Sequence, residues 1–258
     1  MIGKRRTVFL SLVTTVGIAA VLGWQFLPRP YTAQRHPLRY YLSLPANWSP
    51  DRSWPILVIV DGVNQGHFLW NFLRFRQARH ALPFILISPL VVSNSGQPDP
   101  HDYAYSPAVW ARIAHQGAVA FDAAGVLAIV DEVQHTYHGE RQFYLTGWSA
   151  GGHLAWYLIF THPERLAGVV LAGANYTGRG GGTAISTAPE RASLPIRGIQ
   201  GNHDSHLSAL NGQWEQAAAL AVHQGYGNIA RTIIPNASHD PFPDDVFTTL
   251  NDMRTSNP

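Results

Sequence analysis

Seven short stretches along the chain have the apolar pattern of β-strands. Residues 55–60 read Pro-Ile-Leu-Val-Ile-Val and residues 84–88 read Phe-Ile-Leu-Ile-Ser. Continuous β-branched runs of this length are typical of strands buried on both faces, as in a parallel sheet. Residues 39–44 alternate between apolar and polar positions, and further apolar runs lie at 142–146, 168–171, 196–199 and 231–234.

Helical periodicity fills the intervals between these runs. Apolar residues recur at the spacing of one helix face within 126–137, 214–221 and 246–253. Each set forms one apolar stripe that must face a core. Buried strands that alternate with amphipathic helices predict an α/β fold with a mostly parallel central sheet and right-handed crossovers. In such a sheet the ligand site lies at the carboxyl ends of the strands.

The composition indicates a folded body and excludes several kinds of chemistry. Of 258 residues, 46% are hydrophobic and only 13% are charged, against a typical charged share of roughly 25%. The chain contains no cysteine, which excludes disulfides, thiolate metal sites and a cysteine nucleophile. Lys4 is the only lysine, so the body of the chain has no Schiff-base lysine.

The net charge of +2 is concentrated at the N-terminus. The chain has 18 basic and 16 acidic residues. Without Lys4, Arg5, Arg6 and Arg29, 14 basic residues stand against 16 acidic ones, a balance of −2. The body therefore has no basic tract, and we expect no nucleic-acid partner.

The first 30 residues have the pattern of an export segment. Lys4, Arg5 and Arg6 precede an apolar run at 7–27 that is about as long as a membrane span requires. The two arginines and the residues after them also resemble a twin-arginine signal. A cleaved signal peptide and an uncleaved membrane anchor both fit, and a buried N-terminal core helix is a third interpretation. Pro28 ends the segment, because proline cannot continue a helix.

These patterns divide the chain into three parts. Residues 1–30 are the predicted signal peptide or membrane anchor, 31–37 a linker and 38–258 a single folded domain. Both export interpretations place the folded domain outside the cytoplasm, as a periplasmic, secreted or membrane-anchored protein. The run at 7–27 would provide the membrane attachment.

The stretch Gly147–Gly152 reads Gly-Trp-Ser-Ala-Gly-Gly and carries the pattern G-x-S-x-G. A predicted strand precedes it, and a helix-compatible apolar run at 153–160 follows it. This strand–turn–helix setting is what a nucleophile elbow requires. Small residues at Gly147 and Gly151 let strand and helix approach, and Ser149 is then presented near the positive helix N-terminus. The other interpretation is a glycine-rich turn with an incidental serine.

A serine hydroxyl is a weak nucleophile until a base takes its proton, and histidine is the usual base. In the fold that carries the elbow, the chain order is serine, acid, histidine. His239 follows the last predicted strand and precedes the terminal helix, which predicts it as the base. His203 and His206 are the competing candidates.

The acid should follow the preceding strand, where Asp204 lies. An Asx-type turn is the other interpretation of this residue. Asp240 beside His239 is predicted as a cap of the terminal helix. His203, Asp204 and His206 together are too sparse for a zinc site, so no metal is predicted.

An oxyanion hole needs two N–H donors held in place before the reaction. The backbone of Ala150, next to Ser149, is one expected donor. The loop after the strand 55–60 should supply the other, with the N–H of Val63 as first choice and that of Asn64 as second. Asp61 in the same loop is unexpected, because a carboxylate near a developing oxyanion opposes catalysis unless it points away or is hydrogen-bonded.

The chain resembles serine esterases of the α/β-hydrolase fold, and in particular the polyhydroxybutyrate depolymerase and feruloyl esterase group. The resemblance extends from about Leu38 to the terminal helix and is carried by residues 121–126, 141–152 and 162–170. It departs at Asp61, where the group usually has His before glycine. An Asp-Gly pair at this place is similar to siderophore esterases of the same superfamily.

The resemblance implies a Ser149–Asp204–His239 triad, an acyl-enzyme mechanism on carboxylic esters, and no metal or organic cofactor. Residues 38–258 would then be the catalytic domain. Other expected contacts with substrate come from Trp148, Asn64, Tyr103 and Tyr105, the last two in an aromatic loop at 98–107.

The substrate is expected to be a small or oligomeric ester, because the segment 176–194 is too short for a large lid. Two other functions compete with the esterase. One is a serine peptidase of the prolyl-oligopeptidase type, although the chain is too short to include a propeller domain. The other is a non-catalytic binding protein of the hydrolase fold at the cell surface.

Overall fold

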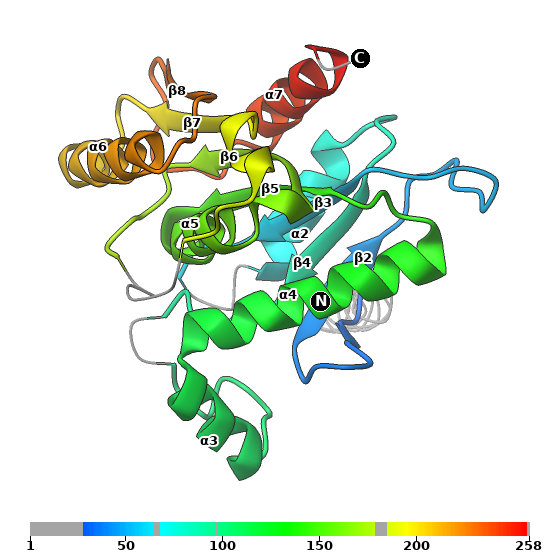
Figure 1. The fold of residues 1–258 in the computed structure, drawn as a ribbon. Helices are drawn as coiled ribbons and strands as arrows, with labels where there is room; N and C mark the ends of the chain where they lie inside the picture. The colour runs from blue at the N-terminus through cyan, green and yellow to red at the C-terminus, as the bar shows by residue number, and fades with distance from the viewer. Residues whose placement is uncertain (1–27, 64–67, 96–97, 179–184, 257–258) are drawn as a thin grey trace, which may run out of the picture.

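A computed structural model describes residues 28–63, 68–95, 98–178 and 185–256. Its centre is an eight-stranded sheet in the order β1-β2-β4-β3-β5-β6-β7-β8 (Figure 1). β1 and β2 join antiparallel, β2 joins β4 antiparallel, and the pairs from β4 to β8 are parallel. The strands are β1 (Tyr31–Thr32), β2 (Arg39–Ser43), β3 (Ile56–Val60), β4 (Ile85–Pro89), β5 (Phe143–Trp148), β6 (Leu166–Ala172), β7 (Ile196–Gly201) and β8 (Ile229–Ile234).

Helices cover both faces of this sheet. α4 (Ala118–Tyr137), α5 (Gly152–Thr161) and α6 (Leu207–His223) pack on one face, and α2 (Phe68–Ala78) and α7 (Pro243–Ser256) on the other. α3 (Pro107–Gln116) precedes α4 and lies outside these layers (Figure 1). Short 3-10 turns lie at Ser149–Gly151, Pro163–Arg165 and Pro189–Ala192. The predicted α/β architecture is confirmed.

Each inner strand divides its side chains between the two faces. In β3, Ile56, Val58 and Val60 join the core under α4 and α5, while Leu57 and Ile59 join the core under α2 and α7. All five residues are at most 2% exposed. Burial of each such side chain contributes about 2 kcal/mol. The continuous apolar run follows from this double burial, because neither face of the strand meets water.

Residues 31–37 do not form the predicted linker. Tyr31 and Thr32 are β1 and pair with the start of β2. The N–H of Ala33 donates to the carbonyl of Leu38 at 3.0 Å, and His36 is only 5% exposed. A strand of two residues is too short to show an alternating pattern, so this edge strand could not be predicted from the sequence.

The predicted export segment at 7–27 lies outside the described residues. Within the part of the chain that the structure describes, no single helix is long and apolar enough to cross a membrane. α3 and α4 pass the same test only as a pair that bends by 110°. Most large apolar residues of α4, among them Val126, Ile129 and Val133, are buried in the core.

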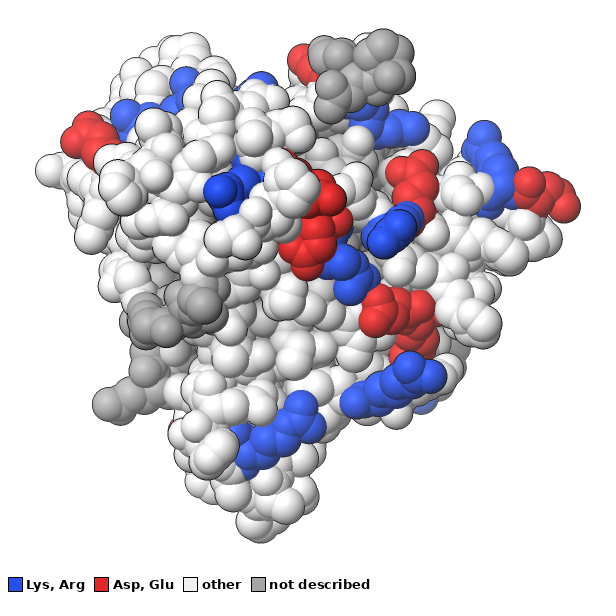
Figure 2. Space-filling view, viewed as in Figure 1, with Lys and Arg blue, Asp and Glu red and all other residues white. Residues whose placement is uncertain are grey.

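Charged side chains interleave over the face of the molecule seen in Figure 2. Basic and acidic residues alternate along a band there, and neither sign forms a broad patch on that face. One close pair joins Arg165 to Asp131 on α4 at 2.5 Å. This mixing agrees with the near-neutral balance of the folded body.

Candidate active site

Polar side chains gather at the carboxyl ends of five strands. The parallel strands run in the same direction, so the loops that follow them meet at one edge of the sheet. These loops follow β3, β5, β6, β7 and β8, and their polar residues are Asp61, Ser149, Asn175, Asp204 and His239.

Ser149 occupies a sharp turn between β5 and α5. Its φ angle is +51°, in the left-handed region that few non-glycine residues adopt. A Cβ atom added to Gly147 would lie 2.9 Å from the Cβ of Ala155, and one added to Gly151 would collide with the carbonyls at the end of β3. The strand–turn–helix setting predicted for Ser149 is therefore present, and its glycines are needed for close packing.

Asp204 and His239 form a short hydrogen-bonded pair. Asp204 Oδ2 lies 2.6 Å from His239 Nδ1, and the two side chains are 1% and 20% exposed. The other carboxylate oxygen, Oδ1, accepts from the N–H of His206 at 2.7 Å. A carboxylate on Nδ1 fixes the proton there and leaves Nε2 as an acceptor, which is the state a general base requires.

Rings and a glycine pack closely around His239. Its centroid lies 5.4 Å from that of Trp148 and 5.3 Å from that of His206. Gly173, with φ +47°, lies behind it, and a Cβ there would be 3.3 Å from His239 Nδ1. Of the competing histidines, His206 thus packs on the predicted base. Among the described residues no group of three or more metal-ligating side chains is present.

The hydroxyl of Ser149 bonds to a residue that the sequence did not single out. Ser149 Oγ donates to Asn175 Oδ1 at 3.5 Å, and the N–H of Asn175 donates to the carbonyl of Ser149 at 2.8 Å. No hydrogen bond of 3.5 Å or less joins Ser149 to His239 in the described structure. Catalytic hydrogen bonds are often long in structures without substrate and shorten when substrate binds. The position of Asn175, just after β6, was the available signal for its role.

Asp61 is hydrogen-bonded to its own loop and to α2. The residue is 2% exposed, and its Oδ1 accepts from the N–H of Gly62 and from Asn71 Nδ2, both at 2.7 Å. A carboxylate in this loop opposes catalysis unless it points away or is hydrogen-bonded, and these bonds hold the Asp61 carboxylate to the loop and to α2. They also occupy the N–H of Gly62, which is then not a free oxyanion donor.

The loop after β3 lies against the nucleophile. A Cβ on Gly62 would be 3.2 Å from Ser149 Cβ and 3.0 Å from Trp148 Cε3. Val63, the first-choice donor, is 58% exposed at this place, and Asn64 lies outside the described residues. Ala150, the other predicted donor, is the second residue of the 3-10 turn Ser149–Gly151 that leads into α5, where the first N–H groups have no intrahelical acceptor.

A buried asparagine orients this loop. Asn94, which is 2% exposed, donates through Nδ2 to the carbonyl of Gly62. In a trans peptide the N–H of the next residue points away from that carbonyl, so Asn94 sets the direction of the N–H of Val63. No local motif indicates Asn94, because its partner lies 32 residues away.

The loop that carries Asn94 is anchored by Asp122 on α4. Asp122 Oδ2 accepts from the N–H groups of Val92 at 2.8 Å and Ser93 at 2.6 Å. Complete burial raises the pKa of Asp122 to about 7, and hydrogen bonds from the loop partly oppose the rise. A helix on one face of the sheet thereby helps to fix a loop at the candidate site.

The predicted aromatic loop forms a small core of its own. Tyr103 is 7% exposed, and its hydroxyl donates to the carbonyl of Val91 at 2.7 Å. Tyr105 stacks on it with centroids 5.9 Å apart, and Trp110 packs edge-on against both rings. The structure gives these tyrosines a packing role, and substrate contact by them stays a prediction.

Asp240 fastens the loop of His239 to α2. Its two carboxylate oxygens accept hydrogen bonds from Nη1 and Nη2 of Arg74, each at 2.9 Å, and Oδ2 also accepts from the N–H of Phe242 at 2.9 Å. Phe242 precedes the first residue of α7, so Asp240 closes the turn ahead of the helix instead of capping its first turn as predicted.

No protein-family model matches the chain, and no curated protein matches it. Solved structures share its fold. An S-formylglutathione hydrolase from Agrobacterium tumefaciens is 12% identical with a TM-score of 0.59, over 87% of this chain and 94% of that one. The esterase Est2 from Thermogutta terrifontis is 13% identical with a TM-score of 0.52, over 90% and 91%.

A thermostable esterase is 17% identical with a TM-score of 0.55 over 89% of this chain. The chain spans 61% of the length of that esterase. At these identities the likeness shows the fold alone. Together with the sheet order and the elbow at Ser149, it shows that the chain has the α/β-hydrolase fold.

Proposed function

We propose that the protein is a serine hydrolase that cleaves carboxylic esters through an acyl-enzyme on Ser149. The observation that carries the proposal is the 2.6 Å bond between buried Asp204 and His239, at the same sheet edge as the left-handed Ser149. An incidental glycine-rich turn gives no reason for a buried acid and a histidine to meet beside it.

The proposed reaction begins when the Ser149 hydroxyl turns from Asn175 to His239. The hydroxyl proton passes to His239 Nε2 while Oγ bonds to the ester carbonyl carbon. Asp204 stabilises the imidazolium, which then gives its proton to the leaving alkoxide as the ester C–O bond breaks. Water repeats these steps with His239 as base and releases the carboxylic acid.

The negative charge that develops on the carbonyl oxygen needs two donors. We assign them to the N–H groups of Ala150 and Val63. Support comes from the position of Ala150 in the 3-10 turn that leads into α5 and from the bond of Asn94 to the carbonyl of Gly62, which directs the next N–H. The mechanism uses no metal or organic cofactor.

The polyhydroxybutyrate depolymerase and feruloyl esterase group is the proposed subgroup, on the residues that resemble it. The substrate is then a small or oligomeric ester. We further propose that the protein is exported, with residues 7–27 as cleaved signal or membrane anchor. Detection of the mature N-terminus by mass spectrometry distinguishes these two fates.

The first experiment compares hydrolysis of p-nitrophenyl acetate, butyrate and octanoate by the full chain and by Ser149→Ala. We expect the variant to lose activity by a factor of about 10³ or more. Ser193→Ala is the matched control, because Ser193 is exposed and its hydroxyl donates to the carbonyl of Glu190 at 3.3 Å, away from the candidate site. Equal activity in Ser149→Ala and wild type would overturn the assignment of the nucleophile.

Two further measurements separate the competing functions. A peptidase would cleave a p-nitroanilide at a rate near that of the matched ester, whereas we expect the ester to react far faster. Labelling by a fluorophosphonate, lost in Ser149→Ala, distinguishes a hydrolase from a binding protein. A wild-type chain that resists the label would favour the binding protein.

A further inference from the structure

Two amide side chains extend from the nucleophile to α6. Asn175 Oδ1 accepts from Ser149 Oγ at 3.5 Å, and Asn175 Nδ2 donates to Gln213 Oε1 at 3.1 Å. The N–H of Tyr176 donates to the same Gln213 oxygen at 2.7 Å. The predicted triad does not include this relay, and the proposed oxyanion hole does not use it.

The hydrogen bonds of this relay determine the orientation of both side-chain amides. A backbone N–H can only donate, so the Gln213 atom that faces Tyr176 must be the oxygen. The Asn175 atom that faces this oxygen must then be the amide nitrogen. The remaining atom of the amide, the oxygen, therefore faces Ser149, and a flipped amide would set two oxygens against each other.

The backbone of Asn175 is held as firmly as its side chain. Its N–H donates to the carbonyl of Ser149 at 2.8 Å. A Cβ added to Gly152 would lie 2.6 Å from the carbonyl oxygen of Asn175, so this loop packs directly on the start of α5. An acceptor of fixed position thus lies beside the reacting oxygen.

Acylation removes the donor that this acceptor uses. When Oγ bonds to the acyl carbon, the hydroxyl proton leaves through His239 with the alcohol, and the ester oxygen that remains on Ser149 has no hydrogen. Asn175 is partly buried, and an acceptor left without a partner costs free energy. A heteroatom on the carbon next to the acyl carbonyl is three bonds from Oγ, within reach of Asn175 Oδ1.

We infer that Asn175, oriented by Gln213, makes the site selective for acyl groups with a hydroxyl or amine on the carbon next to the carbonyl. Such a donor replaces the lost Ser149 hydroxyl as the partner of Asn175 Oδ1. This inference rests on the proposed esterase function but not on the proposed subgroup, and it narrows the substrate class to esters of 2-hydroxy and 2-amino acids.

The test is the ratio of kcat/KM for ethyl lactate to that for ethyl 2-fluoropropionate, measured by titration of released acid. Both esters carry an electron-withdrawing substituent on the same carbon, but only lactate has a donor. The ratio in each variant is compared with that of the wild type, which cancels the intrinsic reactivity of the two esters.

We expect Asn175→Leu to lower the ratio by about three- to tenfold, the range for one hydrogen bond. Gln213→Leu should lower it by a smaller factor, since the amide of Asn175 is then free to turn. Gln213→Glu keeps an acceptor for Asn175 and for Tyr176, and should retain the wild-type ratio. A merely structural role would affect both esters equally in all three variants.

A ratio that stays within twofold of wild type in both leucine variants overturns the inference. If one of them is too slow to assay, the other decides. Ser149→Ala separates this failure from failure of the proposed function. Hydrolysis that depends on Ser149 with an unchanged ratio refutes only the selectivity, whereas hydrolysis independent of Ser149 refutes the esterase itself.

Discussion

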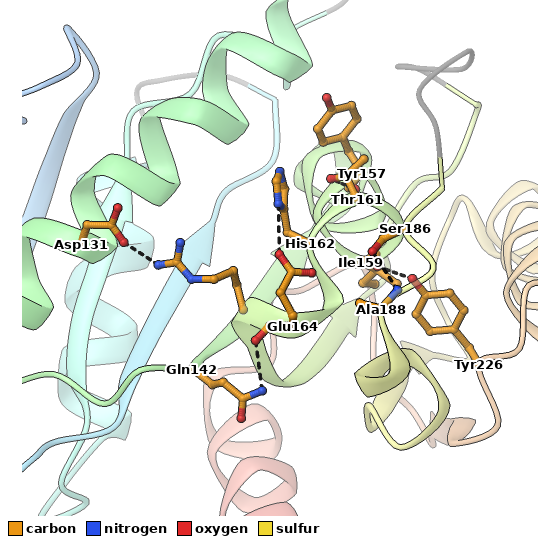
Figure 3. Close-up of polar contacts among 11 residues, drawn as sticks. Asp131, Gln142, Tyr157, Ile159, Thr161, His162, Glu164, Ser186, Ala188 and Tyr226 are labelled. Carbon is orange, nitrogen blue, oxygen red and sulfur yellow. Dashed lines mark hydrogen bonds and ion pairs between the residues drawn. The ribbon is translucent and has the colours of Figure 1, made fainter.

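The two ends of the central sheet carry similar residue types and use them differently. At the amino ends of β5 and β6, Arg165 pairs with Asp131, and His162 lies 3.4 Å from Glu164 (Figure 3). Asp131 is 60% exposed there, whereas Asp204 at the carboxyl ends is 1% exposed. Both ends hold acid–base pairs of short distance, but only one end shields its acid from water.

Exposure determines what such a pair can do. Exposed ion pairs contribute about 0–1 kcal/mol, because water and salt compete with the partner. A groove of about 700 Å³ lies at the amino ends. Three glutamates (Glu140, Glu164 and Glu190) and two arginines (Arg141 and Arg165) line it, so their charges largely neutralise one another. The comparison shows that the burial of Asp204 and its hydrogen bond to His239, more than the presence of charged residues, distinguish the candidate site.

The sharpest test of this comparison replaces the acid at each end. Asp204→Asn keeps the shape of the side chain but removes the charge that orients and stabilises the His239 imidazolium. We expect esterase kcat to fall by about 10³- to 10⁴-fold. Asp131→Asn is the matched control and should leave both kcat and stability close to wild type. Equal effects of the two variants on kcat would refute the distinction.

Burial should also govern pH dependence away from the predicted triad. Burial, with Arg112 nearby, lowers the pKa of His36 from 6.5 to about 4. Between pH 6.5 and about pH 4, His36 is protonated in the unfolded chain but neutral in the folded chain. The free energy of unfolding therefore falls by up to about 3 kcal/mol as the pH drops through this window. Burial raises the pKa of Asp122 from 3.8 to about 7, so this group lowers stability as the pH rises.

His36 and Asp122 change the free energy of unfolding in opposite directions as the pH rises. A variant that removes one group should therefore show the pH dependence caused by the other. His36→Asn should lose stability between pH 4 and 7 as the pH rises, whereas Asp122→Asn should gain it up to pH 6.5. Urea unfolding at pH 4.5 and 6.5 measures both slopes. If the slope of the wild type persists in the two variants, neither group controls the pH dependence.

A smaller effect is expected from a matched pair of glycines. Gly173 and Gly178 both have positive φ angles, +47° and +68°, but a Cβ would meet His239 only at Gly173. Alanine at either position should cost about 1 kcal/mol of stability. Only Gly173→Ala should also reduce kcat, by about 10- to 100-fold, because it displaces the base. A similar kcat for the two variants would show that Gly173 has no link to the site.

The smallest effect is expected at the loop after β3. Asn94→Ala removes the bond that holds the carbonyl of Gly62, and kcat should fall by about tenfold with little change in KM. Affinity for phenylboronic acid, which forms a tetrahedral adduct with serine, should weaken in parallel. Asn211→Ala removes a comparable bond to Arg231 at 2.8 Å and serves as control. A change in KM alone would assign Asn94 to substrate binding instead.

The sequence predicted the elements whose burial is regular. Seven strands were expected from apolar runs, and their bounds agree with the structure within a few residues. α2 was missed because Trp70, 68% exposed, interrupts its apolar stripe. α3 was missed because Ile113 is its one buried residue and gives no stripe. β1 is too short for any pattern.

The candidate site likewise contains residues that the sequence predicted and residues that it did not. Ser149, Asp204 and His239 follow predicted strands in a known chain order, so the strand ends located them. Asn175 and Asn94 are hydrogen-bonded to partners 26 and 32 residues away. Those contacts depend on which strands are neighbours, and no local pattern of one sequence records that order.

The strand order also sets when the site can exist. His239 lies in the loop after β8, the last strand in the part of the chain that the structure describes, where β8 pairs with β7 alone. A chain that emerges N-terminus first can build the elbow at Ser149 long before its base arrives. The proposed triad therefore stays incomplete until β8 and His239 have been added to the sheet. A nascent chain that ends before His239 would lack the proposed base, and we expect it not to hydrolyse esters.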